Sequence, residues 1–309
     1  MSLNDDAQID TSQIEDQRGS GGGGGRLGIP IPVGGGGRGG IVGLIITVLL
    51  LLVGGGFGAS QIFGGGGGSS DNSNLDQACS TANPDRLKRL DCRNALYVNS
   101  IQNFWQSELP QVFGEQYQKA DTVFFSQQTN TGCGAADSGV GPFYCPADRK
   151  VYIDLNFYTE LTNRFGAKGE FAQPYVLAHE YGHHIQDLLG VEAQVQRARQ
   201  RDPSSANRYS VMLELQADCY SGVWAAHATQ TKDAAGHPIF TRVTEQDIQD
   251  AVNAAGAVGD DTIQKKAGRS VDPDNFTHGT SAQREQWFTQ GYRSGDPKAC
   301  DTFNGALGR

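Results

Sequence analysis

Runs of glycine constrain the fold of this chain more than any other feature, and they lie at residues 21–25, 34–37, 54–56 and 64–68. Such segments bury too little apolar surface to offset the entropy lost on ordering, so they are expected to be flexible. We therefore expect a disordered, Gly-rich cytoplasmic tail over residues 1–40, a flexible linker over 60–75 and one folded domain over 76–309.

Residues 41–59, between two glycine runs, are uncharged and mostly apolar. This length suits one membrane-spanning helix, which needs about 17–25 residues. A cleaved signal peptide remains an alternative, because residues 58–60 are small, although forty preceding residues make a long leader. A buried core helix is a third interpretation. We favour a retained transmembrane anchor.

Charges around the apolar stretch predict its orientation. Arg18, Arg26 and Arg38 precede it, and no Lys or Arg follows it until Arg86. Because cytoplasmic flanks of membrane helices are rich in Lys and Arg, we expect a single-pass protein with a cytoplasmic N-terminus and an extracytoplasmic domain.

The six cysteines all follow the apolar stretch, at Cys79, Cys92, Cys133, Cys145, Cys219 and Cys300. An even number of cysteines in an oxidising compartment favours disulfides. Six cysteines allow about 15 pairings. Local spacing favours Cys79 with Cys92 and Cys133 with Cys145, which leaves Cys219 with Cys300. Free buried thiols stay open as an alternative.

The overall charge argues against one class of partner. The chain has 25 Lys and Arg against 34 Asp and Glu, for a net charge of −9. Nucleic-acid-binding domains need a basic surface to neutralise phosphates. We therefore expect no nucleic acid partner.

Hydrophobic periodicity and turn residues predict a mostly helical α+β domain with a small β-sheet. The predicted helices cover residues 85–108, 174–189, 207–229, 244–257 and 281–292. The predicted strands cover residues 122–126 and 150–155. The second strand precedes the helix at 174–189, and we expect it to bind an extended peptide along its edge.

One predicted helix carries the pattern His179-Glu180-Tyr181-Gly182-His183. Histidines four residues apart project from one face, so both imidazoles reach a single Zn²⁺ at about 2.0–2.1 Å. Glu180, beside them, has the position of a general base. The opposite face is apolar and suits packing against a core, with Leu177, Tyr181, Ile185 and Leu188. Two solvated histidines beside a solvated glutamate would be the ordinary alternative.

A catalytic zinc usually has three protein ligands and one open position. Glu214 is our candidate third ligand, because it lies in an apolar helical stretch where an unpaired carboxylate is costly to bury. Asp218, four residues later on the same face, is expected to accept the free ring N–H of a ligand histidine. Two ordinary surface acids would be the alternative.

The remaining histidines differ in their surroundings. His278 lies just before a Thr-x-x-Gln capping box at residues 280–283, which places its imidazole ahead of a helix N-terminus. We predict that it donates a hydrogen bond to an oxyanion, with a structural histidine as the alternative. His184 points away from the ligand face and is interpreted as an orienting or core residue. His227 and His237 have no motif around them.

Several motifs in order resemble the bacterial putative neutral zinc metallopeptidase family. They are residues 131–134 (Thr-Gly-Cys-Gly), 141–146 (Gly-Pro-Phe-Tyr-Cys-Pro), 175–184, 214–219 and 278–281. The resemblance covers residues 76–309 and the preceding apolar stretch. It implies a zincin-like fold and a His/His/Glu zinc site. Together with the predicted membrane topology, we expect a location in the bacterial cell envelope.

The expected activity is hydrolysis of peptide bonds by a zinc-activated water, with Glu180 as general base and Zn²⁺ as cofactor. The expected substrate is a peptide or protein. Two alternatives remain open: a membrane-anchored zincin-fold binding or assembly protein that does not cleave, and a zinc hydrolase of cell-wall peptide amides. A protein that only binds would need the zinc ligands but no general base.

Overall fold

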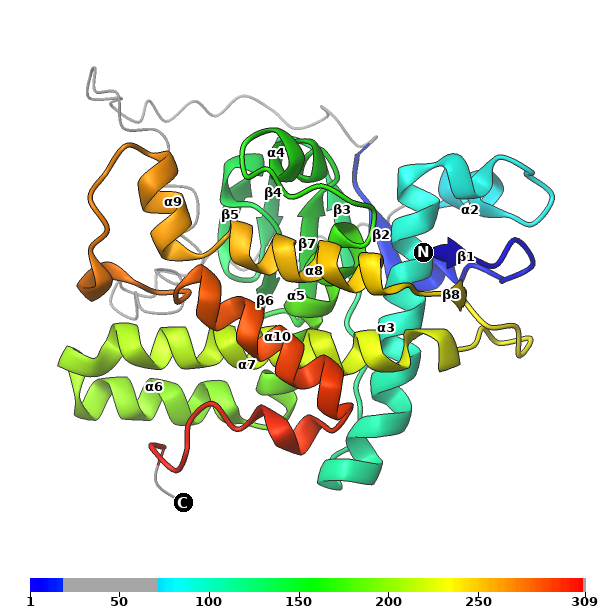
Figure 1. Ribbon diagram of the computed structural model, residues 1–309. Helices are drawn as coiled ribbons and strands as arrows, with labels where there is room; N and C mark the ends of the chain where they lie inside the picture. Colours follow the sequence, from blue (N-terminus) through cyan, green and yellow to red (C-terminus); the bar gives the residue numbers. More distant parts are fainter. Residues whose placement is uncertain (19–71, 308–309) are drawn as a thin grey trace, which may run out of the picture.

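The computed structural model describes residues 1–18 and 72–307, which form a mixed α+β fold that is mostly helical (Figure 1). The helices are α2 (Ser73–Cys79), α3 (Leu90–Phe113), α4 (Phe157–Asn163), α5 (Ala172–Leu188), α6 (Val191–Arg201), α7 (Ala206–His227), α8 (Glu245–Ala257), α9 (Asp260–Lys266) and α10 (Ser281–Ser294). The strands are β1 (Ser2–Leu3), β2 (Ile14–Asp16), β3 (Thr122–Phe125), β4 (Gln128–Thr131), β5 (Gly134–Asp137), β6 (Phe143–Cys145), β7 (Lys150–Asp154) and β8 (Phe240–Arg242).

Helices α5, α7, α8 and α10 agree with the predicted ranges to within two residues. The capping box predicted at residues 280–283 is present, with Thr280 and Gln283, and α8 begins with another, at Thr244 and Asp247. Helix α3 differs from its prediction, because it starts at Leu90 after a 3-10 turn and continues past Pro110. It ends at Gly114, whose φ of 75° is the left-handed conformation that closes helices.

The main sheet has the strand order β2-β3-β7-β6, in which β2, β3 and β7 are parallel and β6 is antiparallel to β7. Alternate residues of its strands face opposite sides. Phe124, Val151 and Ile153 belong to the large core that includes α5. Val123, Phe125 and other residues form a smaller core with Ala136 of the β4–β5 hairpin. Both faces of the sheet are therefore covered.

Strand β7 is a central strand, so the expectation that it binds peptide along its edge is wrong. Its two neighbours, β3 and β6, already use both rows of its backbone hydrogen-bonding groups. Edges of this sheet are formed by β2 and β6 instead.

Helix α5 lies between the sheet and helix α7. On the sheet side, the Tyr181 hydroxyl donates to the backbone carbonyl of Ala120 at 2.8 Å and lies 2.9 Å from the Thr122 hydroxyl. On the other side, a Cβ at Gly182 would come within 2.9 Å of the Cα of Ala217, so glycine lets α5 and α7 approach closely. This approach brings the two metal-candidate helices together.

Helix α10 crosses α7 at a second close approach (Figure 1). A Cβ at Gly222 would lie 2.1 Å from the carbonyl oxygen of Phe288, and one at Gly291 would lie 1.9 Å from that of Cys219. No side chain larger than hydrogen fits such contacts without moving a backbone. The pair of glycines therefore fixes where α10 crosses α7.

Residues 1–18 belong to the folded domain, so the prediction of a disordered tail does not hold for them. Strand β2 pairs with β3, with Ile14 opposite Thr122, and Ile14 is 1% exposed. Asn99 of α3 exchanges two hydrogen bonds with the backbone of Asp10, at 2.8 and 2.9 Å. The domain also begins slightly before the predicted residue 76, at α2.

The predicted membrane anchor, residues 41–59, lies outside the described residues, as do residues 19–40 and 60–71. Among the described residues, no helix combines the length and apolar character needed to cross a membrane. A cytoplasmic N-terminus with an extracytoplasmic domain would put residues 1–18 and 72–307 on opposite sides of a membrane. Because β2 pairs with β3, residues 1–18 and 72–307 must lie on the same side of a membrane. The predicted orientation therefore does not fit this packing.

Replacing Ile14 tests whether residues 1–18 form a structural strand or a disordered tail. Ile14→Ala is expected to lower the free energy of unfolding by about 2–4 kcal/mol, because it leaves a cavity beside β3. Chemical denaturation of the full chain measures this loss. Ser12→Ala, at an exposed neighbour, is the control and should change stability by less than about 0.5 kcal/mol. Equal stability of both variants would indicate that residues 1–18 are a tail that does not stabilise the fold.

All three predicted disulfides are present: Cys79–Cys92, Cys133–Cys145 and Cys219–Cys300. No cysteine of the described residues is free. The third bond joins α7 to the segment after α10 across 81 residues. Closing so long a loop stabilises a fold by about 4 kcal/mol. It also holds together the two helices that cross beside the candidate site.

Candidate metal centre

Helices α5 and α7 bring the predicted ligands together. The Nε2 atom of His179 lies 3.1 Å from one carboxylate oxygen of Glu214, and the Nε2 atom of His183 lies 3.5 Å from the other. One donor atom from each of these three residues lies within 4.8 Å of the other two. His179 and Glu214 are both 7% exposed. Two imidazoles and one carboxylate therefore converge on a single point.

Both imidazoles are oriented through their other ring nitrogen. The Nδ1 atom of His179 lies 2.9 Å from a carboxylate oxygen of Asp218, and that of His183 lies 2.8 Å from the side-chain oxygen of Gln186. Each oxygen can accept a ring N–H at Nδ1, so Nε2 is the nitrogen that would bind a metal. The structure thus brings Asp218 to the position expected from the sequence. Gln186 was not expected, although its spacing of three residues from His183 places it on the same helix face.

Arg284 of α10 compensates the buried charge of Asp218, which is 0% exposed. Its Nε donates to one carboxylate oxygen at 2.7 Å, and its Nη2 donates to the other at 3.0 Å. The Tyr175 hydroxyl donates a further bond at 2.7 Å. Burial alone would raise the pKa of Asp218, but Arg284 and His179 lower it below its ordinary value. Asp218 is therefore a fully bonded carboxylate that fixes the ring of His179.

Glu214 is held as a carboxylate despite its burial. Burial would raise its pKa, but the imidazoles of His183, His278 and His179 lower it well below the ordinary value. Burial likewise opposes a charged His179, yet Asp218 and Glu214 raise its pKa to about 10. A metal cation at the convergent point would replace the second ring proton of His179 as the partner of Glu214. The donor set therefore fits a divalent metal, and two imidazoles with one carboxylate are a common set for catalytic zinc.

Glu180 lies in the same cleft as the three candidate ligands and is 9% exposed. Burial raises the pKa of its carboxyl, while the neighbouring His179 and His183 act in the opposite direction. A raised pKa makes a carboxylate a stronger base near neutral pH. The side chain is thus a buried carboxyl with a raised pKa that lies in the same cleft as the candidate ligands.

His278 also lines the cleft and is 7% exposed. Its Nδ1 atom lies 3.2 Å from one oxygen of Asp260, whose other oxygen accepts the backbone N–H groups of Thr277, His278 and Gly279 at 2.7, 2.7 and 3.0 Å. With Nδ1 engaged, Nε2 is the nitrogen that the ring offers to the cleft. Asp260 was not expected from the sequence, because it lies 18 residues from His278.

The other histidines lie outside this centre. His184 is fully buried, with Nε2 donating to the Gln118 carbonyl at 2.6 Å. Burial lowers its pKa to about 4, so it is a neutral core residue at physiological pH. His227 stacks on Phe104, and His237 contacts Asp233. None of the three belongs to the convergent donor set.

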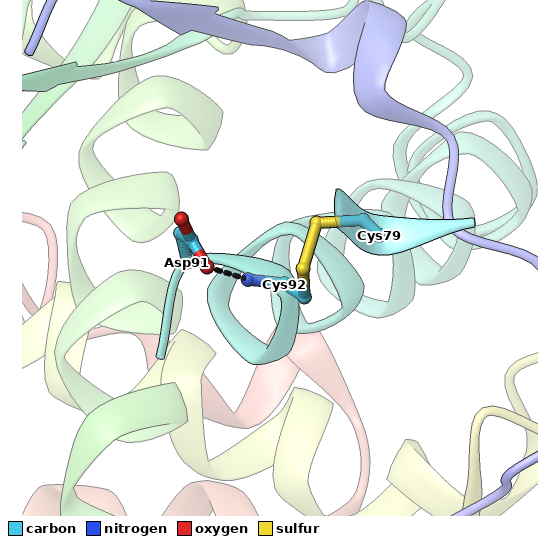
Figure 2. A group of neighbouring side chains, drawn as sticks. All are labelled: Cys79, Asp91 and Cys92. Carbon is cyan, nitrogen blue, oxygen red and sulfur yellow. Dashed lines mark hydrogen bonds between the residues drawn. A yellow bond between two sulfur atoms is a disulfide. The ribbon is translucent and has the colours of Figure 1, made fainter. Parts of the chain in front are cut away.

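A second group of potential ligand atoms, in Cys79, Asp91 and Cys92, does not suit a metal (Figure 2). The two sulfurs are joined in a disulfide, and a metal-binding cysteine must be a thiolate. The carboxylate oxygens of Asp91 already have partners. One accepts the Cys92 N–H at 2.9 Å, and the other pairs with Arg18 at 2.9 Å and with Arg89 at 2.8 Å. Among the described residues, this leaves the group on α5 and α7 as the metal candidate.

The cleft beside the metal candidate has a cavity volume of about 110 Å³ and is open to solvent on one side. Helices α4, α5, α7 and α8 contribute to its wall, together with the segment 138–142 before β6 and the start of α10. The convergent donors are therefore accessible to a substrate.

Comparison with known proteins agrees with this geometry. A profile of the family described as "Putative neutral zinc metallopeptidase" matches residues 5–303, which includes most of the N-terminal segment. The Mycobacterium tuberculosis protein Rv2575 is 45% identical over 234 residues, covering 75% of this chain and 76% of that protein. The Escherichia coli protein YpfJ is 44% identical over 214 residues, covering 69% of this chain and 71% of that protein.

The names of these relatives state no activity, and no solved structure matches the chain. The profile match nevertheless covers nearly the whole chain and includes both helices of the candidate metal centre. This chain belongs to the family of putative neutral zinc metallopeptidases.

Proposed function

We propose that this protein is a zinc-dependent metallopeptidase in which His179, His183 and Glu214 hold the metal. One observation carries the proposal: the three donors converge beside Glu180, at the base of a cleft that is open to solvent. A structural zinc site would need neither the cleft nor the buried base. This argues against a zincin-fold protein that only binds or assembles.

Bound Zn²⁺ in such a site lowers the pKa of a water molecule and polarises a carbonyl group. Glu180 accepts the proton from the attacking water and later donates it to the leaving amine. Asp218 and Gln186 hold the ligand imidazoles in place throughout. Arg284 keeps Asp218 charged and oriented.

His278 is proposed to donate a hydrogen bond to the oxyanion that forms at the attacked carbonyl. Its place in the cleft supports this role, as does the carboxylate of Asp260 behind its Nδ1. A carboxylate on Nδ1 fixes the ring and makes Nε2 the nitrogen that faces a ligand. Asp260 is thus a positioning residue for His278.

The substrate is proposed to be a peptide or protein, and the fold to be zincin-like. We further propose that the domain works outside the cytoplasm, because three disulfides favour an oxidising compartment. Residues 1–18 would share that compartment, since β2 is a strand of the main sheet. The predicted transmembrane anchor at residues 41–59 lies outside the described residues, and a single span there would separate residues 1–18 from the rest of the domain.

Cleavage of a proteome-derived peptide mixture by the purified full chain tests the proposal. We expect mass spectrometry to find new peptide termini with the zinc-loaded protein. A chelator should abolish them, and stoichiometric Zn²⁺ should restore them, because the chelator removes only the metal.

Other outcomes would contradict the proposed metallopeptidase function. Chelator-insensitive cleavage would point to chemistry elsewhere in the chain or to a contaminant, which a mock purification detects. Zinc binding without cleavage of any peptide would favour the non-cleaving protein. Cleavage restricted to cell-wall peptides would favour the hydrolase of cell-wall amides.

A further inference from the structure

Two buried glutamines lie behind the candidate ligand His183, and neither of them lines the cleft. Gln186 on α5 is 0% exposed, and Gln216 on α7 is 6% exposed. Burying an amide costs free energy unless its polar atoms form hydrogen bonds. The partners of these two side chains therefore explain why they lie there.

The two amides form one series of hydrogen bonds that ends at His183, and we call it the amide relay. The Nε2 of Gln216 donates to the backbone carbonyl of Cys300 at 2.9 Å. The Nε2 of Gln186 donates to the Oε1 of Gln216 at 3.1 Å and to the backbone carbonyl of Leu213 at 2.7 Å. The Oε1 of Gln186 lies 2.8 Å from the Nδ1 of His183. The relay thus connects the segment after α10 to a candidate metal ligand.

Backbone carbonyls set the direction of the relay, because a carbonyl oxygen can only accept a hydrogen bond. The carbonyl of Cys300 requires the amide nitrogen of Gln216, which turns the oxygen of Gln216 toward Gln186. The carbonyl of Leu213 requires the amide nitrogen of Gln186, which turns the oxygen of Gln186 toward His183. An oxygen at that place favours the ring proton on Nδ1, so Nε2 keeps its electron pair for a metal.

Rotation of the Gln186 amide by half a turn would reverse this arrangement. Its oxygen would then face two acceptors, the Leu213 carbonyl and the Oε1 of Gln216. Its amide nitrogen would face the Nδ1 of His183 and favour the ring proton on Nε2, where a proton competes with a metal. Gln216 therefore supplies one of the two contacts that oppose the wrong orientation.

The carbonyl at the start of the relay has a fixed position on α7. Cys300 is 1% exposed and is bonded to Cys219, about one helical turn after Gln216. The Thr302 hydroxyl donates to the Met212 carbonyl at 2.7 Å, about one turn before Gln216. The segment is thus attached to α7 on both sides of Gln216, and its carbonyl is a stable reference for the amide.

We propose that Gln216 is a positioning residue of the metal centre, which acts through Gln186 to keep the Nε2 of His183 available for zinc. This rests on the proposed zinc site but not on peptide cleavage. The other imidazole, of His179, is oriented by the carboxylate of Asp218. The amide relay orients His183 without a further negative charge beside the metal.

Zinc affinity of the full chain, measured by competition with a chelator, tests the proposal. Gln186→Met removes the acceptor behind His183 and should weaken zinc binding by about 10- to 100-fold. Gln216→Met leaves that acceptor but lets it rotate, so a smaller loss of about 3- to 10-fold is expected. Methionine is an unbranched side chain of similar length, so both changes largely preserve packing.

The double variant shows whether Gln216 acts through Gln186. Once Gln186→Met has removed the acceptor, Gln216→Met should weaken zinc binding no further, so the two losses should not add. Fully additive losses would mean that Gln216 acts by another route and would overturn the proposal. So would wild-type zinc affinity in Gln216→Met.

Gln102→Met is the matched control for a buried glutamine. Gln102 is 0% exposed, and its Nε2 donates to Gln13 at 2.8 Å. Its Oε1 accepts from the Tyr117 hydroxyl and the Ala120 N–H, both at 3.0 Å. None of these partners belongs to the convergent donor set. The substitution should destabilise the fold but leave zinc affinity unchanged, and a loss equal to that of Gln216→Met would contradict the proposed role.

Gln216→Glu separates hydrogen bonding from packing. Glutamate still offers an oxygen to Gln186, so its zinc affinity should stay closer to the wild-type value than that of Gln216→Met. If Gln216 only fills space, the apolar variant should bind zinc normally and the glutamate, as a buried acid, should be the weaker. That order would refute the relay.

Failure of this proposal is distinguishable from failure of the proposed function. Zinc binding that depends on Gln216, without cleavage of any peptide, would leave the relay standing and remove the peptidase activity. Peptide cleavage with zinc affinity that is independent of Gln216 would do the opposite. A wild-type chain that binds no zinc would overturn both.

Discussion

Glu180→Gln is expected to lower kcat/KM for peptide cleavage by about 100- to 10,000-fold while leaving zinc content and fold unchanged. Glutamine has nearly the same shape as glutamate but cannot accept the proton of an attacking water. Glu180 is not among the three convergent donors, so the metal should remain. Kinetics with a fluorogenic peptide, zinc analysis and thermal unfolding on one preparation measure the three quantities.

Glu160→Gln is the matched control for that variant. Glu160 lines the same cleft but is half-exposed and paired with Arg164. The same chemical change there should alter kcat/KM by only a few-fold. Undiminished cleavage by the Glu180→Gln protein would remove Glu180 as the base. An equal loss in both variants would indicate a general effect of charge on substrate binding.

Glu214→Gln is expected to weaken zinc binding by at least about 10- to 100-fold. Loss of a hydrogen-bonding partner behind a metal ligand already has an effect of this size, and Glu214 is proposed to touch the metal itself. Glutamine keeps the volume but removes the charge from a carboxylate whose pKa the three histidines hold well below its ordinary value. Competition with a zinc chelator of known affinity measures the change.

Glu192→Gln provides the control for this substitution. Burial, with a contribution from Asp187, raises the pKa of Glu192 to about 8, so it is mostly protonated at neutral pH. Glutamine therefore imitates its prevailing state, and Glu192 is not one of the convergent donors. Zinc affinity should stay at the wild-type value. Unchanged affinity in Glu214→Gln as well would exclude Glu214 as the third ligand.

The parts of the site that lie on one helix were predictable from sequence. The predicted helix at 174–189 became α5 with boundaries shifted by no more than two residues, because Pro174, Gly190 and a strong helical period mark it. Leu177, Tyr181 and Ile185 are all 0% exposed, as the apolar face required. Local spacing also predicted the first two disulfides.

Partners from distant parts of the chain were less accessible to sequence reasoning. Arg284 and Asp260 meet Asp218 and His278 only because α7, α9 and α10 pack together. A lone arginine in a polar helix gives no local sign of its buried partner. Glu214 was identified because a metal motif elsewhere required a third ligand and because it lies in an apolar helical stretch, where an unpaired carboxylate is costly to bury.

The N-terminal strand shows the same limit more clearly. Strand β2 is three residues long and pairs with β3, more than a hundred residues away in the chain. So short a strand has no periodicity that would distinguish it from a tail. The adjacent glycine runs then led residues 1–18 to be grouped with flexible sequence. Long-range pairing decides their structure.

Zinc K-edge absorption spectroscopy of the purified full chain tests the central claim most directly. The proposed centre predicts one zinc per chain with two imidazole nitrogens at about 2.0–2.1 Å and the remaining ligands as oxygens. In Glu214→Gln the imidazole contribution should persist at lower zinc occupancy. Sulfur ligands at about 2.3 Å, or a spectrum without imidazole, would contradict the assignment of His179, His183 and Glu214.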